Sequence, residues 1–171
     1  DPATDIGAVH TLDQLKNNLA YVETATAEGA VLRTGGKRIH ESSGGYYMEP
    51  TIFSEVRPEM RIAQEEVFGP VLAILRTSTL DEAIEIENNS AYGNAASVFT
   101  QSGGLANYVA EHASAGMIGV NIGVPVPREP FSFGGWNESK FGTGDITGKS
   151  SIDFWTKLKK TTTKWNPEAR T

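Results

Sequence analysis

The chain has 171 residues, of which 39% are hydrophobic, so it is long enough for one main core and too short for two large domains. Its formal net charge is -6 and its basic residues cluster only between positions 157 and 164, which argues against nucleic acid as a partner. No apolar run approaches the roughly 20 residues of a membrane span and no signal peptide is found, so we expect a soluble, cytoplasmic protein.

Hydrophobic periodicity in the first part of the chain predicts one amphipathic helix over residues 11–29. Thr11 and Gln14 are spaced as a capping box at its start, and Gly29 is a typical stop signal. Short elements are expected after this helix: a strand at residues 30–32, a surface loop or hairpin at 37–45 and a strand at 51–53.

Residues 64–71 read Gln-Glu-Glu-Val-Phe-Gly-Pro-Val and open an apolar run to Leu75 that predicts a buried strand. Side chains alternate along an extended segment, so Glu66 and Phe68 are expected to share one face while Glu65 lies on the other. A carboxylate can accept hydrogen bonds from ribose hydroxyls while an aromatic ring covers a planar group, which suits a nucleotide-like ligand. The alternative is a solvated acidic turn before a core strand, and spacing alone favours it.

The middle of the chain alternates strands and helices. Thr79 and Glu82 form a second capping box before a helix that ends at Asn88-Asn89. A strand at 95–99, a helix at 102–116 and a strand at 117–122 follow. This order predicts an α/β fold of three layers with a mostly parallel sheet, and ligands in such folds lie beyond the carboxyl ends of the strands.

The last part of the chain begins with residues 121–133, whose three prolines predict a stiff irregular loop at the ligand end of the preceding strand. The segment from Phe154 to Trp165 is rich in Thr and Lys, with high β-propensity and little apolar content. It is therefore expected to be an edge strand, and exposed edges are templates for pairing with another chain.

Common catalytic and cofactor motifs are missing from the sequence. Gly142 and Gly144 are followed by no glycine at the Rossmann spacing, and there is no P-loop or H-E-x-x-H motif. The sequence contains no cysteine and its three histidines are far apart, so we predict no metal site and no thiol nucleophile within this chain. His112 is expected to be a partly buried helix residue.

The octapeptide at 64–71 resembles the E-E-x-F-G-P-V motif of the aldehyde dehydrogenase superfamily, and six further segments resemble family motifs in the same order. They are residues 5–7 (D-x-G-P, with Ala8 in place of the usual proline), 49–51 (G-P-T), 88–93 (N-x-x-x-Y-G-L-A), 97–100 (V-F-T), 116–121 (G-x-v-x-V-N) and 130–135 (P-F-G-G, with one residue inserted). The resemblance covers nearly the whole chain.

This resemblance implies roles for individual residues. In the family the second Glu of the motif binds the nicotinamide ribose of NAD or NADP and the Phe packs beside the nicotinamide, roles that fall here to Glu66 and Phe68. By the same likeness Phe133 lines the substrate channel, and Asn121 and the loop from Pro125 to Pro130, called the proline loop below, flank its mouth. Arg128 is a candidate counter-ion for a carboxylated aldehyde or, alternatively, a solvated arginine paired with Glu129.

The resemblance also implies the domain organisation. Residues 1–150 correspond to the later part of the catalytic domain, and residues 151–171 to the oligomerisation strand and tail, which would join a homo-oligomer through Phe154 to Trp165. The family's nucleophilic cysteine and its general base lie before the region covered, so no catalytic residue is assigned and the chain alone is expected to be inactive. The chain starts at Asp1 without a Met, which suggests a fragment or a processed chain.

The implied function is that of part of an NAD(P)-dependent dehydrogenase that oxidises an aldehyde or semialdehyde to an acid or an acyl-CoA. Residues 125–135 and 151–156 are most similar to those of methylmalonate-semialdehyde dehydrogenases, which use coenzyme A as co-substrate. The alternative is a catalytically inactive fragment or pseudoenzyme that serves as a nucleotide-binding or assembly module.

Overall fold

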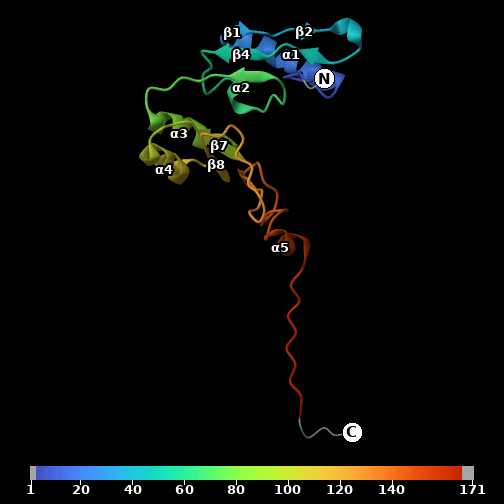
Figure 1. Ribbon diagram of the computed structural model, residues 1–171, viewed down its shortest axis with the longest axis vertical. Coiled ribbons are helices and arrows are strands. Elements are labelled where there is room, and N and C mark those ends of the chain that lie inside the picture. Colours follow the sequence, from blue (N-terminus) through green and yellow to red (C-terminus); the bar gives the residue numbers. More distant parts are fainter. Residues whose placement is uncertain (1–2, 167–171) are drawn as a thin grey trace. The chain divides into compact units, whose positions relative to one another are not determined.

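The computed structural model describes residues 3–166 and divides the chain into two compact units, Asp1–Ser90 and Ala91–Thr171 (Figure 1). The helices are α1 (Leu12–Ala27), α2 (Arg61–Gln64), α3 (Leu80–Asn88), α4 (Gly103–His112) and α5 (Ser151–Trp155), with one 3-10 turn, η1 (Glu41–Ser43). The strands are β1 (Val31–Thr34), β2 (Arg38–Ile39), β3 (Tyr47–Met48), β4 (Thr51–Ser54), β5 (Val71–Ala73), β6 (Tyr92–Gly93), β7 (Ala95–Val98), β8 (Met117–Val120) and β9 (Trp136–Asn137). Over the described residues, no helix is both long and apolar enough to cross a membrane.

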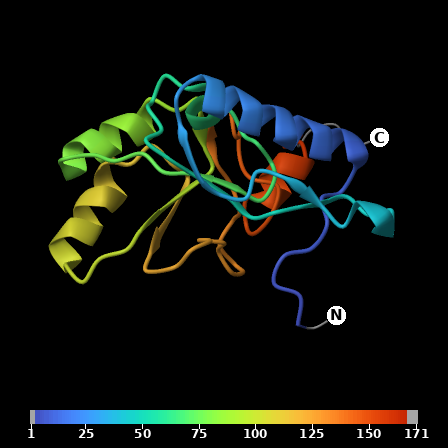
Figure 2. The ribbon, with the colours of Figure 1, turned by 90° about the horizontal axis from the view of Figure 1, so that it is seen from above.

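The first unit is built on a three-stranded sheet in the order β1-β4-β5. Strand β1 is antiparallel to β4, whereas β5 is parallel to it, and α1 packs against this sheet (Figure 2). Leu15 of α1 and Phe53 of β4 are among the fully buried side chains of the core. Strands β2 and β3 pair as an antiparallel hairpin, so of the two alternatives predicted for residues 37–45, hairpin or loop, the structure has the hairpin, with its second strand just beyond residue 45.

Hydrogen bonds between residues three positions apart confirm part of the predicted capping at the helix starts. The Thr11 and Thr79 hydroxyls accept from the backbone N–H groups of Gln14 and Glu82, each at 3.1 Å. The reciprocal halves of both boxes are absent, because the Glu82 carboxylate accepts from Ser78 N instead and the Gln14 amide turns toward the loop before β5. Both helices therefore start where the sequence predicts, each with one capping bond instead of two.

The second unit contains a parallel pair, β7 and β8, joined through α4. Their register runs from Ala95 opposite Met117 to Val98 opposite Val120, which confirms the predicted strand-helix-strand crossover in this unit. A second, antiparallel pair joins β6 to β9 and was not predicted. Both units are thus mixtures of helices and strands that include parallel pairs, as expected for the predicted α/β class.

Helix α4 ends four residues before the predicted end at Gly116. Ala113 has an extended backbone, with ψ of 135°, and Ala113 and Ala115 are buried on the way into β8. Burial of this extended connection outweighs continued helix formation, so the predicted end was wrong. His112 is exposed, not partly buried, and its ring stacks on Tyr108 with centroids 4.1 Å apart.

The predicted edge strand at the end of the chain was wrong at its start, because Phe154 and Trp155 belong to α5. Residues 156–166 are exposed and have no regular secondary structure. A strand is defined by the ladder that it forms with a neighbour, and the described part of this chain offers the segment no such neighbour. Its pairing with a second chain stays a prediction, as does the division of roles at residue 150.

Candidate functional site

The acid and aromatic residues singled out from the sequence lie on the loop between α2 and β5. Glu66 is exposed and the Phe68 side chain is 73% exposed, whereas Val67 between them is 9% exposed and belongs to the core. The extended backbone predicted for this stretch was wrong, because Phe68 has a φ of +53° and the strand starts only at Val71. The loop nevertheless presents Glu66 and Phe68 to solvent together, because the burial of Val67 anchors the backbone between them.

Two polar residues of α1 hold this loop. Gln14 Nε2 donates to the backbone oxygens of Val67 (2.9 Å) and Phe68 (3.2 Å) and to Asn18 Oδ1 (2.8 Å). Asn18 is fully buried, although it lies on the apolar face of an amphipathic helix. Sequence reasoning read Gln14 only as a cap and missed Asn18; the signal was a polar residue at a core position, one turn from Leu15 and Val22.

Gly69 packs so closely against the buried Asn18 amide that a side chain has no room. A Cβ at this position would lie 2.1 Å from Asn18 Nδ2. We expect Gly69→Ala to lower the free energy of unfolding by about 1–3 kcal/mol, because overpacking forces the loop or the amide to move. Gly103→Ala is the matched control, since nothing lies within 4 Å of its added Cβ. Urea unfolding followed by far-UV circular dichroism measures both; equal effects of the two variants would contradict the expectation.

The first acid of the motif, Glu65, is committed to contacts within the protein. Its Oε2 accepts hydrogen bonds from Tyr21 Oη (2.5 Å) and Arg61 Nε (2.8 Å). The Tyr21 hydrogen bond and then Arg61 hold the pKa of Glu65 below its usual range, and Glu65 in turn raises the pKa of Tyr21. The sequence predicted that only one of the two acids faces a ligand. Both acids are exposed, but Glu65 is bonded to Tyr21 and Arg61, which leaves Glu66 as the available acid.

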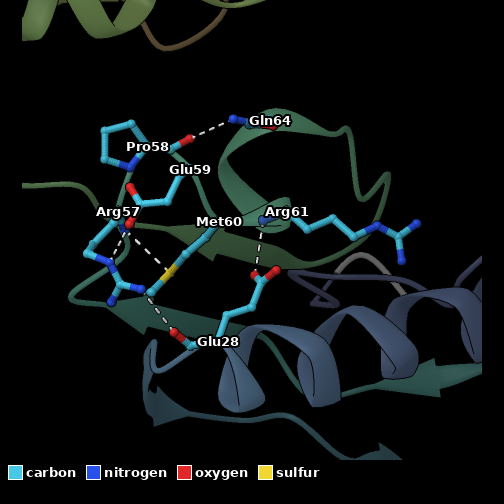
Figure 3. A network of polar contacts seen from close by, with 7 residues as sticks. All are labelled: Glu28, Arg57, Pro58, Glu59, Met60, Arg61 and Gln64. Carbon is cyan, nitrogen blue, oxygen red and sulfur yellow. Dashed lines mark hydrogen bonds and ion pairs between the residues drawn. The ribbon is translucent and has the colours of Figure 1, made fainter.

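The segment that leads to this loop is tied to the end of α1 (Figure 3). Glu28 Oε2 accepts from Arg61 N at 3.0 Å, and the Glu28 backbone oxygen accepts from Arg57 Nη2 at 3.2 Å. Gln64 Nε2 donates to Pro58 O at 3.1 Å and closes the segment on itself. These contacts fix α2 at its start, as the Glu65 contacts fix it at its end.

The residues predicted to line a substrate channel all lie in the second unit. Asn121, just before the proline loop, has a φ of +56°, and its amide bonds the backbone N–H (2.8 Å) and oxygen (2.9 Å) of Thr100. This amide therefore fixes the loop. Arg128 is exposed, and among residues 3–166 it makes no ion pair with Glu129 or any other acid.

Phe133 is 40% exposed and lines a hollow of about 220 Å³ together with Phe154 and other residues. A half-buried ion pair, Lys140 Nζ to Asp145 Oδ1 at 3.0 Å, belongs to the same lining. A separate hollow of about 420 Å³ lies between β8 and the proline loop. Phe133 is thus not gathered with Asn121 and Arg128 around one of these hollows, and the channel roles of all three stay predictions.

Acidic and histidine side chains do not converge elsewhere in the part of the chain that the structure describes. No group of three or more His, Cys, Asp or Glu residues there is arranged to hold a metal ion. Glu66 and Phe68 offer an exposed carboxylate and an exposed ring on a loop that Gln14 holds.

The profile of the aldehyde dehydrogenase family matches residues 1–161. Malonate-semialdehyde dehydrogenase from Bacillus subtilis is 42% identical over 165 residues, which are 96% of this chain and 34% of that protein. An indole-3-acetaldehyde dehydrogenase variant from P. syringae, solved with NAD+ and IAA, superimposes with a TM-score of 0.87 at 42% identity, over 94% of this chain and 32% of that one. Methylmalonate-semialdehyde dehydrogenase from Oceanimonas doudoroffii superimposes with a TM-score of 0.88 at 34% identity, over 97% of this chain and 34% of that one.

Fold and similarity together define a domain of the α/β class. The chain belongs to the aldehyde dehydrogenase family, as the resemblance of its motifs implied. It spans about a third of the length of the relatives that it matches.

Proposed function

We propose that this chain is the C-terminal part of an NAD-dependent semialdehyde dehydrogenase and that it supplies the loop that receives the nicotinamide end of NAD+. The observation that carries the proposal is the exposed pair Glu66 and Phe68 on a loop held by Gln14. A carboxylate with no internal partner among the described contacts fits the two donor hydroxyls of a ribose, and the exposed ring two residues later on the same loop fits a planar heterocycle. The NAD+ bound to the relative from P. syringae supports NAD over NADP.

Under this proposal the residues of this chain bind and orient NAD+, and they take no part in the chemical reaction. Glu66 accepts hydrogen bonds from the ribose, Phe68 limits the movement of the nicotinamide, and Gln14 keeps their backbone in place. When bound, NAD+ supplies the hydride acceptor of an aldehyde oxidation. The thiol nucleophile of such a reaction has no counterpart in this sequence, so we expect the 171-residue chain by itself to give no turnover.

The substrate class that we propose is a short aldehyde that carries a carboxylate. Relatives at about 40% identity are malonate-semialdehyde dehydrogenases, which supports this class. Arg128 is an exposed cation on the proline loop and is our candidate counter-ion, with Asn121 and Phe133 as channel residues. Whether coenzyme A or water receives the acyl group, and a cytoplasmic location, stay predictions from the resemblance.

The test uses a complete enzyme that contains this segment and follows NADH absorbance with malonate semialdehyde and with an uncharged aldehyde of equal length. We expect NADH formation with NAD+, and a lower KM for the carboxylated aldehyde. Runs with and without coenzyme A identify the acyl acceptor. No NADH formation with any aldehyde, in either condition, would contradict the enzyme proposal and favour the silent nucleotide-binding or assembly module.

The tail is proposed to join a second copy of the chain. Residues 156–166 are exposed along their whole length, and Leu158 and Trp165 are apolar side chains that are more than four-fifths exposed. Exposed backbone outside regular structure can add to a sheet edge of another subunit.

A further inference from the structure

We propose that Tyr21, Arg61 and Glu65 form a clamp that positions Glu66 for the nicotinamide ribose, so that Glu65 is a positioning residue and not a ligand. This inference rests on the proposed function of Glu66 and deepens it. It assigns a task to the first acid of the motif and to two residues that no motif contains.

The clamp joins two elements that are far apart in the sequence. Tyr21 lies on α1 with only 6% of its surface exposed, and its hydroxyl reaches Glu65 across 44 positions of sequence. Arg61 is the first residue of α2, and its guanidinium carbon lies 4.7 Å from the centre of the Tyr21 ring. One carboxylate oxygen, Glu65 Oε2, therefore accepts from a hydroxyl donor and a cationic donor, and both bonds hold the side chain toward Tyr21 and Arg61.

The position of the clamp along the chain explains its effect on Glu66. Glu65 is the residue immediately before Glu66, and Val67 immediately after it is buried and bonded through its oxygen to Gln14. The backbone of Glu66 is thus fixed on both sides while its side chain stays exposed. Preorganisation of this kind lowers the conformational entropy that binding must remove, so it strengthens binding without any contact to the ligand.

The start of α2 is held independently of Glu65. The Glu28 carboxylate accepts from the Arg61 backbone N–H, as Figure 3 shows, so α2 stays attached to α1 when the Glu65 contacts are removed. Loss of the clamp should therefore loosen the loop locally without unfolding the unit. A local effect can be separated from global damage by experiment.

The charges of the clamp hold across the neutral range. Glu65 has a lowered pKa, so the stabilisation from its ionised form is present above the usual Glu range and is lost as the pH falls through the lowered value. Tyr21 has a raised pKa, so its protonated, donating form persists until the pH rises through the raised value. Measurements at neutral pH therefore test the intact clamp.

The experiment compares Tyr21→Phe, Glu65→Gln and Glu66→Gln in a complete aldehyde dehydrogenase that contains this segment, with Glu23→Gln, an exposed acid of α1, as the matched control. Dissociation constants are measured calorimetrically for NAD+ and for ADP, which lacks the nicotinamide ribose. If the clamp positions Glu66, Tyr21→Phe and Glu65→Gln should raise the dissociation constant for NAD+ about three- to tenfold, which corresponds to one hydrogen bond. The dissociation constant for ADP should not change. Glu23→Gln should change neither constant.

The other outcomes separate the inference from the function on which it rests. If Glu66→Gln weakens the binding of NAD+ but not of ADP, while Tyr21→Phe and Glu65→Gln change neither, the proposed clamp is overturned and the ribose role of Glu66 survives. If the clamp variants lose affinity for NAD+ and for ADP equally, the substitutions cause structural damage only, and the positioning role is also overturned. If Glu66→Gln leaves NAD+ binding unchanged, the proposed function itself fails.

Discussion

Replacing Phe53 with alanine is expected to lower the free energy of unfolding of the first unit by about 3–5 kcal/mol, the range for a fully buried Phe. Phe53 has no exposed surface and lies on β4, the central strand of its sheet, where it belongs to the core that α1 covers. Truncation removes the transfer free energy of the ring and leaves a cavity that strands paired on both sides cannot close. The effect is large compared with the total free energy of unfolding of a typical domain, which is about 5–15 kcal/mol.

The matched control is Phe68→Ala in the same unit, because this ring is 73% exposed and should contribute within about 0.5 kcal/mol to stability. The chain's three tryptophans, Trp136, Trp155 and Trp165, all belong to the second unit, so their fluorescence does not report on the first. Hydrogen exchange of the β4 amides or far-UV circular dichroism in urea is the suitable measurement. A loss below about 1 kcal/mol for Phe53→Ala would contradict the placement of the core.

Glu66→Gln in a complete enzyme is expected to raise the dissociation constant for NAD+ by about 10- to 100-fold, because hydrogen bonds to a charged group are worth about 1.5–3 kcal/mol. The glutamine keeps the size of the side chain but replaces one acceptor oxygen with a donor, which cannot pair with a ribose hydroxyl in the same way. Since Glu66 is exposed and makes no core contact, the thermal unfolding midpoint should not change.

Two further measurements sharpen this prediction. Glu66→Asp keeps the charge and shortens the reach, so an intermediate loss is expected if the carboxylate binds directly. KM for NAD+ should rise in both variants, and kcat should fall as well where the loosened ribose lets the nicotinamide leave its productive position. Unchanged affinity in Glu66→Gln together with an intact fold would remove Glu66 from the site.

Local features of the fold could be predicted from the sequence because they depend on neighbouring residues. Thr11 and Thr79 cap the helices that the periodicity of Leu, Val and Ala places after them, since a capping bond spans only three residues. The parallel pairing of β7 with β8 followed from the order strand, helix, strand. Features that needed a partner strand were not predicted: β9 forms only because β6 pairs with it, and Phe154 lies in a short helix instead of an edge strand.

In the candidate loop, too, local features could be predicted from the sequence and long-range contacts could not. The sequence singled out Glu66 and Phe68, and their exposure agrees with that choice, but the reasoning relied on an extended backbone that Phe68 does not have. The residues that hold the loop were missed, because neither Tyr21 nor Asn18 belongs to a local pattern with residues 64–71. Asn18 could have been suspected from its polarity on an apolar helix face.

The sequence by itself therefore determined the family, the starts of the three longer helices α1, α3 and α4, and the parallel crossover, and it singled out Glu66 and Phe68 as candidates for cofactor contact. All of these follow from short-range periodicity, capping and a contiguous motif. Only the tertiary structure decided that Glu65 is hydrogen-bonded to Tyr21 and Arg61 while Glu66 has no such partner among the described contacts, and that Gly69 must remain small beside Asn18. The Glu65–Tyr21 and Gly69–Asn18 contacts join residues more than 40 positions apart, and packing of α1 against the loop, which no local rule encodes, brings them together.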